Sequence, residues 1–319
     1  MELKTQARQT HPAVVILITL VAVLMGFQVV GPMIGFFVAL PFYPGTLLEM
    51  TEALKDPTSD PNMKVPLYLM QGFGTLFGLI LVPMFLLTRF HESLTDLFRK
   101  AIPVQAALLI GLIVMVFMIT NSFFIEWNKD IHLPSGIEEW AKSTEEQLGE
   151  LTEYLTSFDS QAQVFLALIV IAVLPAIGEE LVFRGIIQRE FFRASNNIHL
   201  AIWTSAAIFS AIHLQFYGFV PRMLLGALFG YVYYWSGNLW IPVLAHFINN
   251  GFTVIAMYLY QQGSVKMDIE SSEAAPWPAV AGCGVATVLL LYIFKKMYEK
   301  HKATELLNNT NEDHTTLVP

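Results

Sequence analysis

The ionisable residues of this sequence that could do chemistry stand inside its most apolar stretches. Glu179, Glu180 and Arg184 occur in the run AIGEELVFRG at residues 176–185. A bare charge in hydrocarbon costs at least ~2.5–3.5 kcal/mol, so embedded ionisable residues indicate a functional site when a partner can be named. The other strongly polar side chains in apolar segments are His213, Arg222, His246, Asn249 and Asn250.

The spacing of the two glutamates predicts different environments for them. On a helix, Glu180 and Arg184 are four residues apart and project from nearly the same side, so they can pair directly. Glu179 is turned by about 100° from Glu180 and remains available for chemistry. The alternative is that Glu179, Glu180 and Arg184 form one structural charge cluster that fixes the helix at the membrane interface.

Two later apolar segments supply further groups. FSAIH ends at His213, and HFINN places His246 and Asn250 four residues apart on one helical face. A glutamate can act as general base with one histidine assisting, while the other histidine and the asparagine stabilise an oxyanion. Glu179, His213 and His246 also form a credible zinc set, although no H-E-x-x-H pattern occurs. A metal-free site is the preferred interpretation, and zinc is the alternative.

The composition predicts helices that cross a lipid bilayer. Of 319 residues, 55% are hydrophobic and only 14% are charged, and the mean hydropathy is +0.53. These values exclude an ordinary soluble globular protein, and no basic patch points to a nucleic-acid partner. About 20 apolar residues are needed for each span. Eight segments approach that length: Val14–Phe37, Val65–Leu87, Ala101–Phe124, Gln163–Val182, Leu200–Phe216, Phe219–Trp235, Leu239–Tyr260 and Trp277–Phe294.

Charges in the loops predict the orientation of these spans. Cytoplasmic loops carry an excess of Lys and Arg. Such residues occur before the first span, between the second and third, after the fourth and after the eighth, whereas the alternate loops are acidic. Both termini are therefore expected in the cytoplasm of a multi-pass protein of the cell membrane. The residues used for this inference are Lys4, Arg8, Arg89, Arg99, Lys100, Arg189, Arg193, Lys295, Lys296, Lys300 and Lys302.

We expect a single membrane domain over residues 1–319, with a catalytic core at 160–260. Residues 126–160 form an acidic outer loop, in which apolar residues at helical spacing predict one amphipathic helix on the outer surface. The polar tail at 303–319 is expected to be disordered. Three GxxxG spacings predict close helix packing: Gly31/Gly35, Gly74/Gly78 and Gly226/Gly230. The single Cys283 is interpreted as a packing residue.

An estimate of depth in the membrane conflicts with a site that Glu179 and His213 share. If the fourth span enters the cytoplasm near Gln188, Glu179 lies roughly 14 Å deep at 1.5 Å per residue. His213, counted from Ile198, lies roughly 22 Å deep. A tilt of the fifth span, or a bend at Pro175, would be needed to bring the two side chains together.

Three motifs together resemble the CPBP family of intramembrane proteases, which includes CAAX prenyl endopeptidases and bacteriocin-processing (Abi) proteins. They are EExxxR at Glu179 to Arg184, FxxxH at Phe209 to His213, and HxxxN at His246 to Asn250. The resemblance covers roughly Val164 to Thr253. Each motif alone is weakly specific, but their order on successive apolar spans is much more so.

The resemblance implies an eight-helix membrane endopeptidase. Glu179 would activate water with His213, and His246 and Asn250 would form the oxyanion hole, with Glu180 and Arg184 in support. The site is expected to open towards the cytoplasm and to act on a hydrophobic or membrane-associated peptide or protein in the lipid bilayer. Prenylation of the substrate and the oligomeric state stay open. A proton-coupled transporter and a non-catalytic scaffold or immunity factor are the alternatives from other classes.

Overall fold

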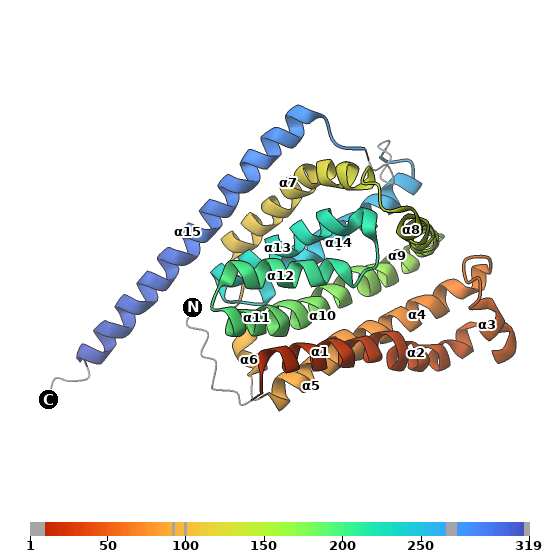
Figure 1. Cartoon of the computed structure of the whole chain (residues 1–319), viewed down its shortest axis with the longest axis horizontal. Helices are drawn as coiled ribbons and strands as arrows, with labels where there is room; N and C mark the ends of the chain where they lie inside the picture. The colour runs from red at the N-terminus through yellow and green to blue at the C-terminus, as the bar shows by residue number, and fades with distance from the viewer. Residues whose placement is uncertain (1–9, 91–92, 99–100, 266–272, 316–319) are drawn as a thin grey trace.

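Helices dominate the computed structural model, which describes residues 10–90, 93–98, 101–265 and 273–315, with side chains as far as Lys300 (Figure 1). Within these residues no β-strand occurs, so the prediction of an all-α membrane protein is confirmed. Lys4, Arg8, Arg99 and Lys100, which were used to predict orientation, lie outside the described residues.

Several spans are assembled from consecutive helical pieces. The first runs from Pro12 to Phe42 as α1 (Pro12–Met25), η1 (Gly26–Val30), α2 (Gly31–Ala39) and η2 (Leu40–Phe42). The second follows α3 (Leu47–Ala53) and contains η3 (Pro61–Met63), α4 (Lys64–Gly74), η4 (Thr75–Leu81) and α5 (Val82–Arg89). Then come α6 (Leu94–Leu97), α7 (Val104–Lys129) and α8 (Ser135–Thr156).

The fourth span is the longest of the composite helices, from Gln161 to Ser195. It contains α9 (Gln161–Ala167), η5 (Leu168–Val173), α10 (Leu174–Val182), η6 (Phe183–Ile187) and α11 (Gln188–Ser195). The remaining elements are α12 (Ile198–Ala211), η7 (Phe216–Gly218), α13 (Phe219–Ser236), α14 (Trp240–Gln261) and α15 (Trp277–Thr315).

All eight predicted segments coincide with helices, but they differ in length and hydropathy. Within the described residues, six helices are long and apolar enough to cross a membrane. The fifth segment, α12, is a shorter apolar helix, and α13 is not among the six. The count of eight spans therefore stays a prediction.

Proline explains three of the π-helical segments. Pro32, Pro83 and Pro175 each lie two residues beyond the end of a π segment, namely η1, η4 and η5. Because proline has no N–H, a carbonyl in the preceding turn loses its donor, and a wider turn is one local adjustment. The fourth π segment, η6, contains Arg184 and no proline. Isolated π turns of this kind are frequent at functional sites.

The ends of two helices differ from the prediction and remove the conflict in depth. The fourth helix continues past Gln188 to Ser195, which places Glu179 about 24 Å from its end at 1.5 Å per residue. That depth is close to the value for His213, so neither a tilt nor a bend is required. The fifth helix ends at Ala211 and not at Phe216, and Leu214 has a left-handed φ of 57° that no regular helix accommodates.

The glycine spacings bring helices into close contact, as predicted. A Cβ at Gly31 would lie 2.5 Å from the Cα of Gly74, so the first two GxxxG motifs pack on one another. A Cβ at Gly78 would lie 2.3 Å from the backbone nitrogen of Phe27. Such distances are far below van der Waals contact, so no side chain larger than hydrogen fits without moving a helix.

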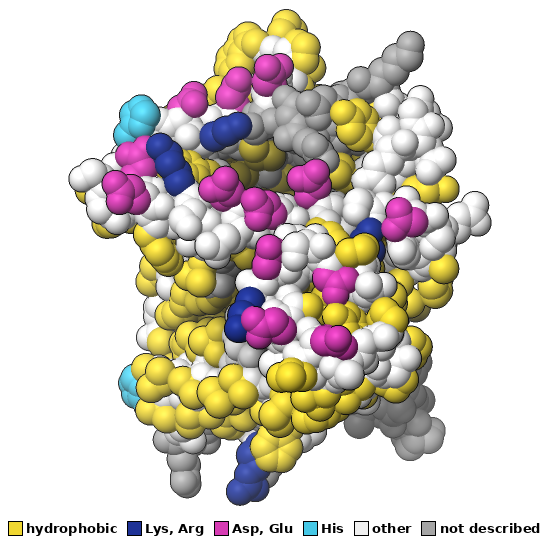
Figure 2. Space-filling model, turned by 90° about the vertical axis from the view of Figure 1, so that its right-hand side faces the viewer, with side chains coloured by type: hydrophobic (Ala, Val, Ile, Leu, Met, Phe, Trp, Pro, Cys, Tyr) yellow, Lys and Arg dark blue, Asp and Glu magenta, His cyan; other side chains and the backbone are white. Residues whose placement is uncertain are grey.

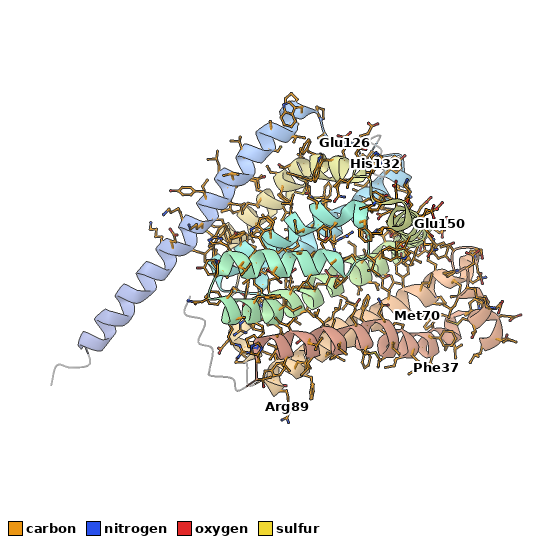
Figure 3. The ribbon with its side chains drawn as sticks, in the orientation of Figure 1. Phe37, Met70, Arg89, Glu126, His132 and Glu150 are labelled. Atoms are coloured by element: carbon orange, nitrogen blue, oxygen red, sulfur yellow. The ribbon has the colours of Figure 1, made fainter. Side chains whose placement is uncertain are left out.

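The amphipathic helix predicted in the acidic loop is α8, which lies across one end of the bundle (Figure 1). Its C-terminal end is fixed by contacts with the neighbouring spans. Lys64 donates to the carbonyl of Ser157 at 2.6 Å, and Gln261 donates to that of Thr156 at 2.7 Å. Charges differ between the two ends of the bundle. Glu126, His132 and Glu150 lie at the α8 end, whereas Arg89 lies at the other (Figure 3).

The disorder expected of the polar tail at 303–319 stays a prediction. Helix α15 continues to Thr315, while residues 316–319 lie outside the described part. Between Gly284 and Pro319 the sequence has neither glycine nor proline, and Lys, Glu, Leu and Ala favour helix. Nothing in this stretch therefore ends the helix that begins in the last span.

Candidate active site

Glu180 and Arg184 form a buried ion pair at the centre of the bundle. Arg184 Nη1 lies 2.9 Å from Glu180 Oε1, and the two side chains are 1% and 0% exposed. The guanidinium also donates to the carbonyl of Gly226 at 2.5 Å. It lies near the rings of Phe209 and Phe229, 5.3 and 5.5 Å from their centroids. The spacing predicted this pair, and its burial makes it part of the packing.

The third GxxxG motif explains how Arg184 reaches a backbone carbonyl. Gly226 and Gly230 lie on α13, and their carbonyls accept from Arg184 and Gln188, which are also four residues apart. A Cβ at Gly230 would lie 2.8 Å from Gln188 Oε1. The glycines therefore let α13 approach closely enough for side chains of the fourth span to bind its backbone.

His246 is held by the same carboxylate. Its Nδ1 lies 2.9 Å from Glu180 Oε1, and its ring stacks on Phe229 with the centroids 5.0 Å apart. Because an ionised carboxylate only accepts, the ring donates through Nδ1–H. This bond and the stacking fix the direction in which Nε2 points.

Nε2 of His246 points to Glu179, with 3.7 Å between it and Oε2 of the carboxylate. This separation is too long for a direct hydrogen bond, yet both groups can bond to one water beside them. Glu179 is 13% exposed, whereas Glu180 is fully buried. The two adjacent glutamates thus occupy the different environments that their spacing predicted.

His213 lies in the turn that follows α12. Its Nδ1 is 2.7 Å from the carbonyl oxygen of Phe209, which would otherwise be unpaired at the helix end. Since a carbonyl only accepts, Nδ1 carries the proton, and Nε2 of the neutral ring is free to accept one. The FxxxH spacing therefore ends a helix and orients a base at the same time.

Asn250 has a structural contact that its motif did not predict. Its Nδ2 donates to the carbonyl of Ile171 at 3.2 Å, and its Oδ1 accepts from Asn249 at 3.1 Å. Of the sequence-predicted residues, Glu179, His213, His246 and Asn250 all line one cavity, and Glu180 and Arg184 lie behind it.

The cavity has a volume of about 860 Å³ and extends from Glu179 and His246 to the α8 end of the bundle. Its deep part contains Glu179, Phe209, His213 and His246, and its outer part is lined by Lys129, His132 and the start of α13. One face of α8 points inward, with Glu138, Lys142, Glu145 and Glu146. Acidic side chains also gather on the surface of this end (Figure 2).

Polar side chains join α8 to the site through contacts that the sequence did not predict. Arg222 Nη2 donates to Gln215 Oε1 at 2.6 Å, and Gln215 Nε2 donates to Glu145 Oε1 at 3.4 Å. Burial raises the pKa of Glu145, and the charge of Arg222 opposes that rise. Arg222 stood out as an embedded charge, but nothing in the spacing connected it with α8.

The position of the cavity bears on its predicted orientation. The charge pattern places α8 outside, whereas the site was expected to open to the cytoplasm. Because α8 lines the cavity, the charge pattern favours an outward opening, and the side on which the site opens stays a prediction. As for metal ions, no group of three His, Cys, Asp or Glu side chains in the described residues is arranged to hold one. The metal-free site and its zinc alternative at Glu179, His213 and His246 both stay predictions.

Comparison with known proteins identifies relatives of the central part of the chain. Residues 161–252 match the family model described as "Type II CAAX prenyl endopeptidase Rce1-like". "Uncharacterized protein YpbD" of Bacillus subtilis (strain 168) is 34% identical over 85 residues, which are 25% of this chain and 40% of that protein. "Membrane-embedded CAAX protease MroQ" of Staphylococcus aureus (strain USA300) is 31% identical over 120 residues, 36% of this chain and 47% of that protein.

These matches confirm the resemblance to the CPBP family over the segment that carries all three motifs. The chain spans less than half the length of the curated relatives it matches. No solved structure matches the chain.

Proposed function

We propose that this chain, whose residues 161–252 resemble the CAAX endopeptidases of the CPBP family, is an intramembrane endopeptidase. The observation that carries the proposal is the 3.7 Å approach of Glu179 to His246 at the wall of a cavity of about 860 Å³. The buried pair of Glu180 and Arg184 fixes the histidine, and apolar helices enclose the whole arrangement. No such combination is required for helix packing alone.

In the proposed reaction, Glu179 takes a proton from water as the water oxygen attacks the carbonyl carbon of the scissile peptide bond. The carbonyl oxygen becomes an oxyanion. Hydrogen-bond donors of His246 and Asn250 stabilise its negative charge. His213 assists the proton transfer through its free Nε2. The proton then passes to the leaving amine nitrogen as the C–N bond breaks, which leaves a carboxylic acid and an amine.

The substrate class follows from the position of the site. The cavity lies among apolar helices, so we propose a hydrophobic or membrane-associated peptide or protein as substrate. The reaction as written needs no metal ion, and we propose that hydrolysis is metal-free. We propose that the protein lies in the cell membrane, and the excess of Lys and Arg at the end opposite α8 favours a cavity that opens to the outer face.

A cleavage assay tests the activity. The protein purified in detergent is incubated with a library of quenched hydrophobic peptides, and the wild type is compared with Glu179→Gln. Loss of the general base should lower the rate by about 10²–10⁴-fold. Unchanged cleavage by a folded Glu179→Gln protein would refute the assignment of Glu179.

A labelling experiment tests the orientation. Thr253→Cys, in a chain with Cys283→Ala, places a thiol on an exposed side chain that lines the cavity. A membrane-impermeant maleimide added to intact cells should label it if the cavity opens outward. Labelling only after the cells are broken would restore the expected cytoplasmic opening.

A further inference from the structure

Of the two arginines that stand in apolar segments, Arg184 contacts a carboxylate and Arg222 does not. Arg222 Nη2 donates to the amide oxygen of Gln215 at 2.6 Å, and its Nη1 is buried without a hydrogen-bond partner. No carboxylate of the described residues forms an ion pair with this guanidinium. An amide oxygen accepts a hydrogen bond but is neutral. A buried cation is costly without a counter-ion, so its presence indicates a functional partner.

The guanidinium belongs to the wall of the cavity that holds the candidate catalytic residues. Arg222 lines this cavity together with Glu179 and His213. Its partner Gln215 stands two residues after His213, so the Cα atoms of these two residues are at most about 7.6 Å apart. A Cβ at Gly218 would lie 3.2 Å from Nη2 and 3.5 Å from Nη1 of Arg222, so the guanidinium rests against η7. The positive charge therefore lies beside the place where a peptide would be cleaved.

The segment that carries Arg222 is fixed before any ligand binds. Asn128 of α7 is buried, its Nδ2 donates to the carbonyl of Phe216 at 2.8 Å, and its Oδ1 accepts from the N–H of Val220 at 2.6 Å. These two bonds tie both η7 and the start of α13 to α7. Gln215 holds one side of the guanidinium at the same time. A charge that is held in position binds a ligand with a smaller loss of conformational entropy.

Two carboxylates of α8 that line the same cavity bond to other groups. Glu138 forms an ion pair with Lys142 at 2.7 Å. Glu145 Oε1 accepts from the amide nitrogen of Gln215, at the end of that amide that does not contact Arg222. Burial raises the pKa of Glu145, which favours its neutral form. A contacting counter-ion for Arg222 can therefore be supplied by a ligand in the cavity.

We propose that Arg222 binds a carboxylate of the peptide substrate, which gives the cavity an anion-binding subsite beside the site of hydrolysis. The subsite rests on the proposed function and deepens it, because it names a group that selects the substrate. A guanidinium stays protonated, and its planar N–H groups match the two oxygens of a carboxylate. The carboxylate belongs either to an aspartate or glutamate side chain or to the C-terminus of the peptide. No bond is made or broken at Arg222.

Cleavage of matched peptides tests the subsite. A peptide that the library assay identifies is prepared as a neutral form with a C-terminal amide, as forms with one glutamate at successive positions, and as a form with a C-terminal carboxylate. The wild type should cleave an anionic form with a kcat/KM at least about 10-fold above that of the neutral form. The preferred form identifies the source of the carboxylate. In Arg222→Gln the kcat/KM values of the two forms should agree within about twofold.

Two further variants separate charge from folding. Arg222→Lys keeps the charge without the planar N–H groups and should keep part of the preference. Arg222→Glu should instead prefer a form with lysine at the selected position. The ratio of two peptides on one preparation does not depend on the fraction of protein that is folded, so partial unfolding leaves the test valid. Equal cleavage of all forms by the wild type, or an unchanged preference in Arg222→Gln, would overturn the subsite.

A binding measurement distinguishes the subsite from the proposed function. Fluorescence anisotropy follows the binding of labelled neutral and anionic peptides to Glu179→Gln, in which cleavage is blocked. The anionic peptide should bind at least about 10-fold more tightly, and adding Arg222→Gln should remove the difference. A wild type that cleaves no peptide, together with this binding preference, would refute the proposed function alone. Cleavage by the wild type with equal binding of both peptides would refute only the subsite.

Discussion

Replacing Arg184 by methionine should strongly destabilise the protein, because the change leaves a buried carboxylate without its counter-ion. Glu180 is fully buried and Arg184 is 1% exposed, so neither charge is compensated by bulk water. Removing one partner of such a pair costs about 3–5 kcal/mol. The carbonyl of Gly226 also loses its donor, which costs about 1–3 kcal/mol. Methionine has a similar length, so no large cavity adds to these values.

The two costs share one guanidinium and are therefore not additive. A destabilisation of at least about 3 kcal/mol is a large part of the 5–15 kcal/mol that holds an ordinary domain folded. Glu180 also accepts the Nδ1–H of His246. A Glu180 side chain that has lost its counter-ion should no longer hold the ring of His246 in one orientation. Activity should therefore fall together with stability, and both losses should have one cause.

Glu179→Gln is the matched control at the adjacent position. Its side chain is 13% exposed, and its recorded contact with His246 is 3.7 Å long. Its effect on stability should be within about 0.5 kcal/mol, as for substitutions that break no buried contact. Its rate should nevertheless fall by about 10²–10⁴-fold. Substitutions at positions 179 and 184 thus separate loss of rate alone from loss of fold and rate together.

Thermal unfolding followed by intrinsic fluorescence in detergent, with peptide cleavage measured in parallel, provides the assay. The double variant Glu180→Met with Arg184→Met removes both charges, so it should recover much of the stability that Arg184→Met loses. An unfolding temperature of Arg184→Met equal to that of the wild type would refute the reasoning about the buried pair. A Glu179→Gln protein as unstable as Arg184→Met would refute the division between the two glutamates.

Three further predictions concern packing, metal content and pH. Gly78→Ala should lower the unfolding temperature because the new Cβ would collide with Phe27. Gly282→Ala should leave the unfolding temperature unchanged because nothing lies within 4 Å of its Cβ. Equal effects of the two substitutions would contradict the packing argument. Metal analysis should find far less than one zinc per chain and cleavage that resists chelators; one zinc per chain with chelator-sensitive turnover would establish the zinc alternative. Because folding raises the pKa of Glu145, the folded state favours the protonated carboxyl. The contribution of Glu145 to the free energy of unfolding is therefore present at low pH and is lost as the pH rises through the raised pKa. Glu145→Gln should therefore raise the unfolding temperature more at pH 8 than at pH 5, and an equal gain at both would exclude this cause.

Local patterns in the sequence were sufficient for much of the fold. Apolar runs of about 20 residues determine helices in a bilayer because each backbone N–H and C=O must be paired within its own segment. The four-residue spacing of Glu180 and Arg184 determines their pairing, since helix geometry alone puts them on one side. Gly31 and Gly74 mark the close packing of two helices, because only a hydrogen atom fits as side chain where the two backbones meet.

Helix ends and contacts between helices were decided by the tertiary structure. The sequence shows apolar residues through Phe216, yet α12 stops at Ala211, where His213 binds the carbonyl of Phe209. Likewise, the polar residues after Gln188 do not end the fourth helix, because packing holds it to Ser195. These two helix ends set the depths of Glu179 and His213 relative to each other. Counting residues from assumed membrane boundaries had made the two depths unequal.

The sequence by itself predicted which residues could carry the chemistry, and it determined the helices on which they lie and the pairing of Glu180 with Arg184. Only the tertiary structure decided that Glu180 also holds His246, that Asn250 binds the carbonyl of Ile171, and that α8 lines the cavity. The physical reason is the range of the interactions. Helix periodicity relates residues within a few turns, whereas the contacts of the site join segments 66 to 79 residues apart, whose relative placement depends on how all the helices pack.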